Sequence, residues 1–298
     1  MKLSREALQD LFLAGKIAHL TLNQIERHIK PGVPISSIHD SIVKFITQTK
    51  GVRLAFPPNI SIDECAAHDT AAPDPYERRV IPKNALVKID IGASVNGMLS
   101  DSAMTISTGG KHLKLVKASI SALNNAIDII RPGLRVRRIS AVIQDTIEGY
   151  GFKPVTNITG HEMEKGNLHA GLSIPSTESF AQRSKIKKGM ILAIEPFSTR
   201  GSAGYVEGRG SPLIFSSDGR PKSDVGKVLV ERYKKLPFSL RSATFFLRER
   251  SMEVEDLAKL LDEDNFHGYR PLIEKSGGLV SQAEHTVLVT SKGARVLT

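Results

Sequence analysis

Apolar residues near the N-terminus recur at three- and four-residue steps, the spacing that places side chains on one face of a helix. Ser4, a residue type that caps helix N-termini, precedes them, and Pro31-Gly32 ends the segment. The apolar positions are Leu8, Phe12, Leu13, Ile17 and Leu20. A second amphipathic helix follows, with Ser36 or Ser37 as its cap and an end near Gly51. Its apolar face carries Ile38, Ile42, Phe45 and Ile46.

Strand-like segments follow this pair of helices, and the same order of elements then recurs. The predicted elements are strands at 85–91 and 97–107 with a turn over 92–97, helices at 113–130 and from Pro132-Gly133 to 149–151, and strands near 155–159 and 190–194. Six residues of the first helix pair match residues of the second at a constant offset of 101. They are Ile29, Pro31, Gly32, Ile38, Ile42 and Ile46. The pattern predicts an old internal duplication. The product would be an α+β body of two pseudo-symmetric halves with a cleft between them, where binding sites tend to lie.

The pattern changes between residues 207 and 275. Helices are expected at 224–236 and 252–261, and the stretch between them is basic and aromatic. We therefore predict an inserted, mainly helical subdomain at 207–275, and a catalytic core formed by 1–206 and 276–298. The chain closes with a strand at 285–290.

Composition narrows the class of protein. The 298 residues, 40 % hydrophobic and 24 % charged, are typical of a globular chain with a sizeable core. The single cysteine, Cys65, excludes an internal disulfide and a cysteine-based zinc site, and is better explained as a small core residue than as a nucleophile. No secretory signal or membrane-spanning stretch is evident, so we expect a soluble, cytoplasmic protein. The net charge of +10 fits either an anionic neighbour such as nucleic acid or a solvated basic surface.

Four carboxylates occur inside apolar, strand-like sequence: Asp90, Asp101, Glu195 and Glu284. Any one of them alone is explained by the exposed side of an alternating strand. All four together are harder to explain in this way, because their neighbours resemble strands covered on both faces. Buried carboxylates must take up protons or find cations, and two divalent metal ions would balance four of them.

Histidine supplies the other common ligand type. His161 and His169 lie in the glycine-rich segment 159–171, and His68 follows the turn-forming region 56–59. A lone histidine is more often a surface residue or a hydrogen-bonded core residue than a ligand. The zincin helix motif, a Walker-type phosphate loop and a G-x-S-x-G elbow are all missing from the sequence.

Taken in order, these segments resemble the methionine aminopeptidases of the pita-bread metallopeptidase fold. The resemblance covers residues 5–298 and is closest to the type 2 enzymes in their short archaeal form, since Glu195 and Glu284 are 89 residues apart. The motifs that carry it are Ala55-Phe-Pro-Pro-Asn59 with Ala66-Ala-His-Asp69, Lys88-Ile-Asp-Ile-Gly92, Ser100-Asp101, Gly160-His161, Leu168-His-Ala-Gly-Leu-Ser-Ile-Pro175, Ala193-Ile-Glu-Pro-Phe197 and Glu284-His-Thr286.

The resemblance implies a site with two divalent metal ions, of Co, Mn, Fe or Zn. Asp101 and Glu284 would bridge the two ions. The implied ligands are Asp90, Asp101, His161, Glu195 and Glu284. His68 and His169 would contact the substrate, and Glu195 would move a proton from water to the leaving amine. The implied methionine pocket is Phe56, Leu168 and Tyr269.

The implied function is removal of the N-terminal methionine from nascent proteins and peptides, with a preference for a small second residue. Another pita-bread enzyme, such as an Xaa-Pro peptidase or a creatinase-like hydrolase, is the first alternative. A non-catalytic ribosome- or RNA-binding relative is the second, although all five ligands are present. We expect a monomer without a specific nucleic-acid partner or a membrane partner. Ribosome contact is an additional possibility, with 232–250 as a candidate surface.

Overall fold

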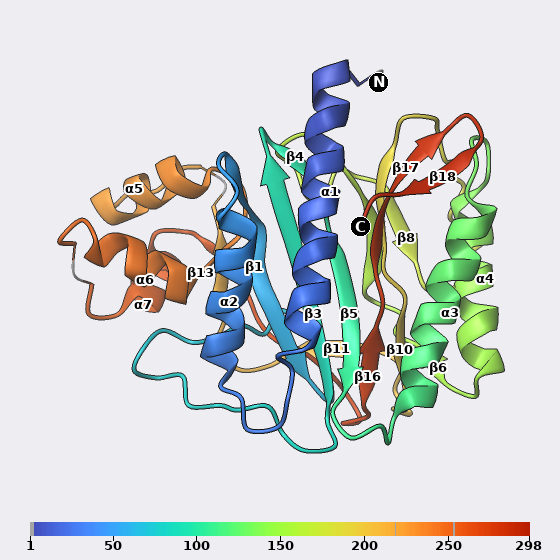
Figure 1. The fold of residues 1–298 in the computed structure, drawn as a ribbon, viewed down its shortest axis with the longest axis horizontal. Coiled ribbons are helices and arrows are strands. Elements are labelled where there is room, and N and C mark those ends of the chain that lie inside the picture. The colour runs from blue at the N-terminus through green and yellow to red at the C-terminus, as the bar shows by residue number, and fades with distance from the viewer. Residues whose placement is uncertain (1–2, 218, 253) are drawn as a thin grey trace.

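The computed structural model describes residues 3–217, 219–252 and 254–298. Two helices and a four-stranded antiparallel sheet form its N-terminal part (Figure 1). Helices α1 (Arg5–Glu26) and α2 (Ile35–Thr47) pack against β1 (Val52–Ile62) and β3 (Leu86–Val95). Strand β3 also pairs with β4 (Met98–Leu99) and β5 (Ser102–Ser107). Isoleucines from both helices and from β3 share one buried core.

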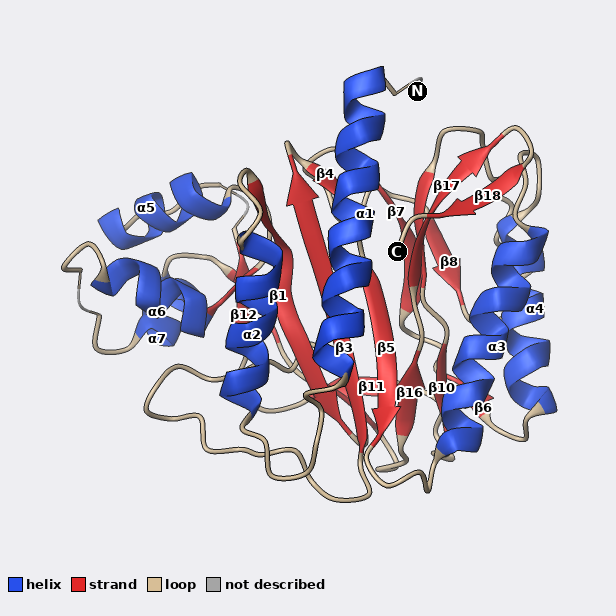
Figure 2. Cartoon of the chain, in the orientation of Figure 1, coloured by secondary structure: helices blue, strands red, loops and turns tan. Residues whose placement is uncertain are grey.

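A second layer of similar design follows. Helices α3 (Leu113–Ile129) and α4 (Val136–Gly149) share a buried core with the second main sheet, whose strand order is β18-β17-β9-β7-β8 (Figure 2). Its strands are β7 (Thr159–Met163), β8 (Ser173–Pro175), β9 (Ile191–Ile194), β17 (His285–Thr290) and β18 (Gly293–Val296). The predicted α+β class is confirmed.

Smaller sheets join these layers. One contains β6 (Lys153–Pro154), β10 (Phe197–Thr199) and β16 (Val280–Gln282). Another contains β2 (Cys65–Ala67), β11 (Val206–Gly208) and β15 (Leu272–Glu274). Because β15 pairs with β2 and β11 pairs with β15, the two ends of the predicted 207–275 insertion pair with each other and are tied to the main body through β15.

The first helix begins as predicted, because the Ser4 side chain accepts a hydrogen bond from the Ala7 amide. The predicted apolar face is partly wrong, since Leu13 and Leu20 are exposed and only Ile17 of the three later positions is buried. The buried face instead includes small residues. A side chain at Gly15 would overlap Leu297 of the C-terminal segment, so glycine is needed where these two segments touch.

Two other predictions are corrected. Helix α2 starts at Ile35 with Pro34 as its N-cap, because the proline ring fixes the extended entry to the helix, so the serines at 36 and 37 lie inside it. Residues 56–59 are not a turn but part of β1, where the pairing with β3 shifts register around Pro57 and Pro58. Proline cannot donate to a strand ladder and is tolerated at such irregularities.

Strand boundaries also differ from the predictions. The predicted turn over 92–97 is shorter, because β3 continues to Val95 and the chain reverses at Asn96-Gly97. The strand predicted at 155–159 is replaced by β6 before it and β7 after it. The strand predicted at 285–290 is confirmed as β17.

The two helix–helix turns make the same backbone hydrogen bonds. Gly32 N donates to Ile81 O and Gly133 N donates to Ile186 O, both at 2.8 Å. These glycines have positive φ angles of +85° and +88°, a conformation that favours glycine. Three residues further on, each second helix begins with an amide that donates to the same distant segment, Ile35 N to Arg79 O and Val136 N to Ser184 O. The offset of 101 found in the sequence therefore relates two structurally similar turns.

The segment between β11 and β15 has an apolar core of its own, drawn from residues 213–266 and rich in phenylalanine. Its elements are β12 (Ile214–Ser216), α5 (Asp224–Tyr233), β13 (Phe238–Ser239), α6 (Leu240–Arg248), α7 (Leu257–Glu263) and β14 (His267–Tyr269). The helix predicted at 252–261 starts later, at Leu257, and α6 was not predicted. Arg241 of α6 joins this segment to the main body through ion pairs with Asp40 and Asp74.

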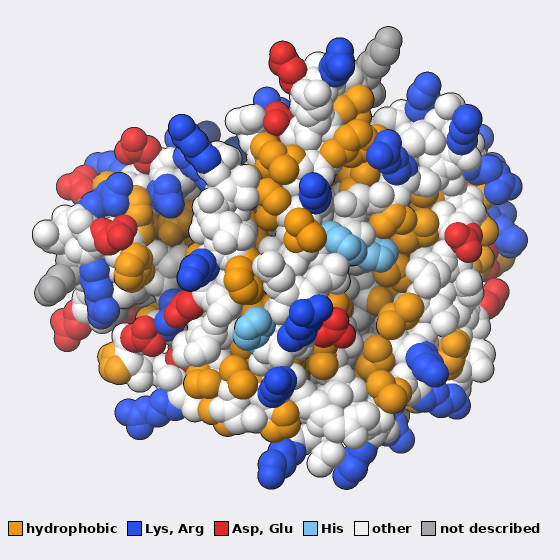
Figure 3. Space-filling view, viewed as in Figure 1, with side chains coloured by type: hydrophobic (Ala, Val, Ile, Leu, Met, Phe, Trp, Pro, Cys, Tyr) orange, Lys and Arg blue, Asp and Glu red, His pale blue; other side chains and the backbone are white. Residues whose placement is uncertain are grey.

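No helix in the described part of the chain is long and apolar enough to cross a membrane. On the molecular surface, a run of Lys and Arg side chains follows the upper right edge in Figure 3, beside α4 and the β17–β18 hairpin.

Candidate metal centre

The candidate site lies where the two main sheets meet. Ala103 of β5 forms a backbone bridge with Glu284, which directly precedes β17. Two residues earlier, the Asp101 amide donates to the Thr286 hydroxyl at 2.7 Å, and this hydroxyl donates back to the Asp101 carbonyl. These contacts fix Asp101 and Glu284, which are 183 positions apart in the sequence, on opposite sides of one seam.

Three buried side chains converge at this seam. Asp101, His161 and Glu284 each offer a ligand atom, and these atoms lie within 4.8 Å of one another. His161 comes from β7, and its Nε2 atom is 3.4 Å from both Asp101 Oδ2 and Glu195 Oε1. Two ligands about 2.1 Å from one tetrahedral ion would be about 3.4 Å apart, so this spacing suits atoms that share a cation.

Asp90 approaches the same group from β3. It lies opposite Asn59 in the β1–β3 pairing and is electrostatically coupled to Asp101. The Gln282 amide group donates to Asp90 Oδ2 at 3.2 Å and to Glu284 Oε2 at 3.1 Å. Sequence reasoning missed Gln282, because a neutral amide gives no charge conflict in an apolar strand.

Burial dominates the electrostatics of these groups. It raises the pKa values of Asp90, Glu195 and Glu284 well above the ordinary range, and the charge of Asp101 raises them further. Burial also raises the pKa of Asp101 to about 7 and lowers the pKa of His161 to about 4. Without a cation the carboxyl groups therefore tend to hold protons, and the imidazole is neutral.

The donor set fits divalent metal ions. Asp90 Oδ1 and Glu284 Oε1 are buried and have no hydrogen-bond partner among the described residues. The nearby buried Lys88 does not neutralise them, because its ammonium group donates to the carbonyls of Asp63 and Val280. Carboxylate oxygens and a neutral imidazole are suitable ligands for Mn, Fe, Co and Zn. A buried group of this composition is favourable only when a cation or protons balance it.

The two further histidines lie at the border of this group. The His169 ring contacts the His161 ring, with centroids 4.4 Å apart, so the ring is partly desolvated although the residue as a whole is exposed. His68 makes an edge contact with Tyr269 at 5.4 Å. Burial, reinforced by neighbouring imidazoles, lowers the pKa values of His68 and His169 to about 4, so both rings are neutral near pH 7.

His68 has an unusual backbone conformation, with a φ of +63°. The Asn59 side chain accepts a hydrogen bond from the His68 amide at 2.7 Å and donates to the Pro57 carbonyl. Asn59 was part of a sequence motif but was not predicted as a site residue. A backbone held in a sparsely populated region indicates that its surroundings determine it, and it aims the His68 ring.

The residues predicted to form the methionine pocket lie in two separate groups. Phe56 and Leu168 belong to one apolar cluster, whereas Tyr269 contacts His68 and its hydroxyl lies 3.0 Å from Ser216 Oγ. A side chain at Gly92 would overlap the Phe56 ring and the Ser100 carbonyl, so glycine is required there for Phe56 to fit.

The sequence predicted that the four carboxylates all lie within strands, and this prediction is only partly right. Asp90 lies in β3, but Asp101 falls between β4 and β5, Glu195 follows β9, and Glu284 precedes β17. Three of the four carboxylates are thus placed next to strand ends, where the sheets meet, and only Asp90 lies within a strand.

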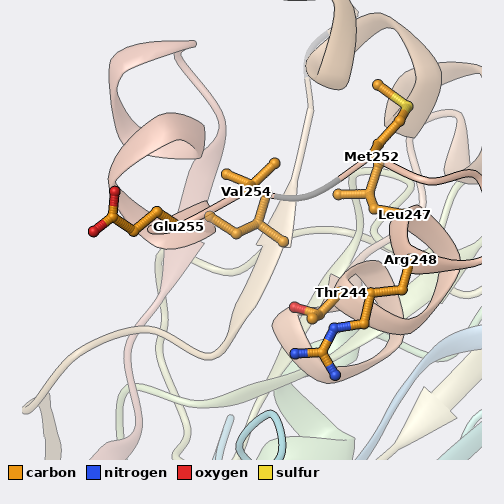
Figure 4. A pocket seen from close by; sticks show the side chains of 7 residues that line it. Thr244, Leu247, Arg248, Met252, Val254 and Glu255 are labelled. Carbon is orange, nitrogen blue, oxygen red and sulfur yellow. The ribbon is translucent and has the colours of Figure 1, made fainter.

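A cavity of about 510 Å³ lies elsewhere, in the segment between β11 and β15. Thr244, Leu247 and Arg248 of α6 line one side together with Met252, and Val254 and Glu255 lie across from them (Figure 4). None of its lining residues belongs to the site predicted from the sequence.

Comparison with known proteins agrees with this site. The model of metallopeptidase family M24 matches residues 10–291. The chain belongs to metallopeptidase family M24. It is 37 % identical to a methionine aminopeptidase of Thermococcus onnurineus over 99 % of both chains. An M24 chain of this kind is a metal-dependent peptidase, which the buried Asp101, His161 and Glu284 group supports.

Solved structures show the M24 fold. A methionine aminopeptidase from Thermotoga maritima superimposes with a TM-score of 0.73 at 22 % identity, covering 99 % of this chain and 98 % of the other. A thermophilic Arx1 superimposes with a TM-score of 0.81 at 17 % identity, covering 99 % of this chain and 91 % of the other. At these identities the likeness shows the fold alone.

Proposed function

We propose that this protein removes the N-terminal methionine from polypeptides by hydrolysing the first peptide bond, and that it prefers a small second residue. The convergence of Asp101, His161 and Glu284 on one buried point supports this proposal most directly. The methionine aminopeptidase of Thermococcus onnurineus, alike along its whole length, supports the substrate class.

In this proposal five side chains would hold two divalent ions. Asp101 and Glu284 would serve both ions, Asp90 would hold one of them, and His161 with Glu195 would hold the other. When bound, such ions supply Lewis acidity and make a water molecule nucleophilic near neutral pH. The unpartnered oxygens of Asp90 and Glu284 and the 3.4 Å contacts of His161 support this assignment. The ions are Co, Mn, Fe or Zn, and cellular availability decides among them.

The chain's own residues then perform the proton and substrate steps. Glu195, buried beside His161, accepts the proton of the attacking water and delivers it to the leaving amine. His169, neutral at pH 7 and partly open to solvent, donates a hydrogen bond to the carbonyl oxygen of the first residue. His68 lies near the leaving nitrogen, in the orientation that Asn59 maintains.

The methionine side chain binds among Phe56, Leu168 and Tyr269. Phe56 is buried and part of a firm apolar cluster, which suits one fixed wall of the pocket. Aromatic walls favour a thioether by about 0.3–1.5 kcal/mol for each contact. The free α-amine of the substrate binds near the carboxylate group, which explains why cleavage is restricted to the first residue.

The organisation of the chain belongs to the same proposal. We infer two halves that arose by duplication, because both helix–helix turns share their hydrogen bonds. We infer a subdomain at 207–275, because residues 213–266 have their own core, although its ends pair with each other and one of them, β15, pairs with β2. We further propose a cytoplasmic monomer whose substrates are nascent chains at the ribosome.

Peptide cleavage tests the substrate assignment. With Mn or Co added, Met-Ala-Ser is expected to release methionine, whereas Ala-Pro peptides are expected to remain intact. Cleavage of the Xaa-Pro bond alone would make the protein a proline-specific member of the family. Absence of any hydrolysis with intact metal binding would favour a non-catalytic relative.

A further inference from the structure

Three segments that are far apart in the sequence form one surface beside the start of α4. The α3–α4 turn binds the segment before β9, through Gly133 N to Ile186 O at 2.8 Å and through a bridge between Arg135 and Lys185. The same turn binds the β17–β18 hairpin, where Ala294 N donates to Ile130 O at 3.1 Å. The three segments are 129–144, 179–194 and 285–298.

These segments contain many cations and no acidic side chain, and the exposed acids Asp128, Asp145 and Glu178 directly flank them. We call their ten basic side chains the α4 basic surface: Arg131, Arg135, Arg137, Arg138, Arg183, Lys185, Lys187, Lys188, Lys292 and Arg295. All except Arg137 are exposed. Their combined charge equals the net charge of +10 of the whole chain. The candidate stretch 232–250, by contrast, contains Glu249 and the paired Arg241.

The cations of the α4 basic surface lack acidic partners. None of the ten forms an ion pair within 4.0 Å in the described ranges. The positive charge of Lys187 acts to lower the pKa of Glu162, but the two side chains form no ion pair. Arg137 stacks 5.2 Å from the exposed Phe180 ring, and its buried Nε atom has no hydrogen-bond partner. The charge is therefore available for a ligand.

The other half of the molecule provides an internal comparison. Its equivalent turn makes the same hydrogen bonds, yet Pro34, Ser36 and Ser37 stand where the second half has Arg135, Arg137 and Arg138. The turn therefore folds without these arginines. Cations at a helix N-terminus are also unfavourable, because the helix dipole is positive there. An arrangement that costs stability and that the fold does not need indicates a bound anion.

We propose that the α4 basic surface binds the phosphate backbone of RNA. This inference rests on the proposed function, because nascent N-termini emerge from the ribosome, whose surface is largely RNA. Six of the ten cations are arginines, whose planar guanidinium groups bind phosphate through two hydrogen bonds. The exposed Phe180, 77 % accessible, offers a ring on which an unpaired base can stack.

An anionic membrane fits this surface less well. Interfacial binding needs several apolar anchors, and Phe180 and Val296 are the large hydrophobic residues exposed in the three described segments. A ligand bound at the α4 basic surface would also leave the candidate metal centre uncovered. Lys188 precedes β9 and Glu195 follows it, which separates the two sites by about 20 Å of extended chain.

The test measures binding of a labelled RNA hairpin, whose stem supplies phosphates and whose loop supplies unpaired bases, by fluorescence anisotropy at several salt concentrations. The test variant is R131Q/R135Q/R138Q/K185Q/K187Q. The matched control is R53Q/R232Q/K235Q/R248Q/R250Q, which removes the same number of exposed cations from β1 and the 207–275 segment. Both variants are first checked for an unchanged melting temperature and for methionine release from Met-Ala-Ser.

The proposal predicts that the test variant binds RNA at least tenfold more weakly than the parent protein. The control variant should bind RNA less than threefold more weakly than the parent. Each lost phosphate contact should also reduce the salt dependence, by about 0.7–0.9 in log Kd per log salt. Equal losses in both variants, or no binding at about 50 mM salt, would overturn it. Loss of binding only to phosphatidylserine vesicles would assign the surface to membranes instead. Loss of peptidase activity with normal RNA binding would count against the proposed function and not against this surface.

Discussion

Gln282 offers a sharp test of how the candidate metal centre is organised. Its amide group donates to one oxygen of Asp90 and one oxygen of Glu284, at 3.2 and 3.1 Å. This leaves the other oxygen of each carboxylate, Asp90 Oδ1 and Glu284 Oε1, buried without a partner and free to bind a cation. Replacing Gln282 with leucine keeps the side-chain volume but removes both donors.

The expected cost appears mainly in the metal-bound state. A hydrogen bond to a charged group contributes about 1.5–3 kcal/mol, but only part of this is lost when a carboxylate can rotate or rebind water. Partners that orient metal ligands typically change affinity by about 10- to 100-fold, which corresponds to about 1.4–2.7 kcal/mol. The protein without metal should lose little stability, because Gln282 Oε1 is itself unpartnered and its removal relieves a buried polar atom.

Calorimetric titration with Mn or Co measures this difference. We expect Q282L to raise the metal Kd by about 10- to 100-fold while melting of the metal-free protein changes by only a few degrees. S281A is the matched control, because the neighbouring Ser281 hydroxyl is buried, unpartnered and not part of the carboxylate group. A metal Kd for Q282L within threefold of the parent, or an equal change in S281A, would refute the reasoning.

The remaining predictions concern the pH dependence of stability, the packing around Gly92 and the attachment of the inserted segment. Burial raises the pKa of Asp101 to about 7 and lowers the pKa values of His68, His161 and His169 from 6.5 to about 4, and these effects on stability oppose each other below about pH 6.5. Above that pH the histidines are neutral in both states, so the melting temperature of the metal-free protein should fall as pH rises from about 6.5 through 7. Saturation with metal should abolish this decline, and a metal-free protein that gains stability over the same range would contradict the assignment. G92A should destabilise the fold by about 1–3 kcal/mol and raise KM for Met-Ala-Ser, since the added methyl group overlaps the Phe56 ring, and unchanged denaturant midpoints would refute this. R241M should cost about 1–2 kcal/mol, because Arg241 is mostly buried while Asp40 and Asp74 are more exposed, and a double-mutant cycle with D40N should show coupling. Additive effects in that cycle would show that the Arg241–Asp40 ion pair does not attach the inserted segment to the main body.

Much of this fold follows from sequence patterns with a local cause. The Ser4 cap, the Pro-Gly turns and the continuous apolar, β-branched run in 285–290 each specify an element directly, and the structure contains all of them. The positions that escaped prediction depend on distant contacts. Leu13 and Leu20 match a helical period, but the face that is buried depends on where β3 and the C-terminal segment pack.

The candidate site shows the same division. Asp101, His161 and Glu284 stand out in the sequence because a charge or imidazole in apolar surroundings demands a partner, and the structure brings them together. Gln282 and Asn59 give no such signal, because neutral amides are tolerated anywhere that offers hydrogen bonds. Their importance depends on a seam between two sheets that no local pattern describes. Strands of only three residues, such as β11 and β15, are likewise too short to show a period.

The central claim is that Asp90 of β3 and three carboxylates that lie next to strand ends, together with His161, hold two adjacent metal ions. Anomalous diffraction from crystals soaked in manganese measures this most directly. We predict two peaks about 3.5–4 Å apart, with Asp101 and Glu284 touching both, Asp90 touching one, and His161 with Glu195 touching the other. A single peak, or peaks bound by other residues while these five side chains stay metal-free, would contradict the account.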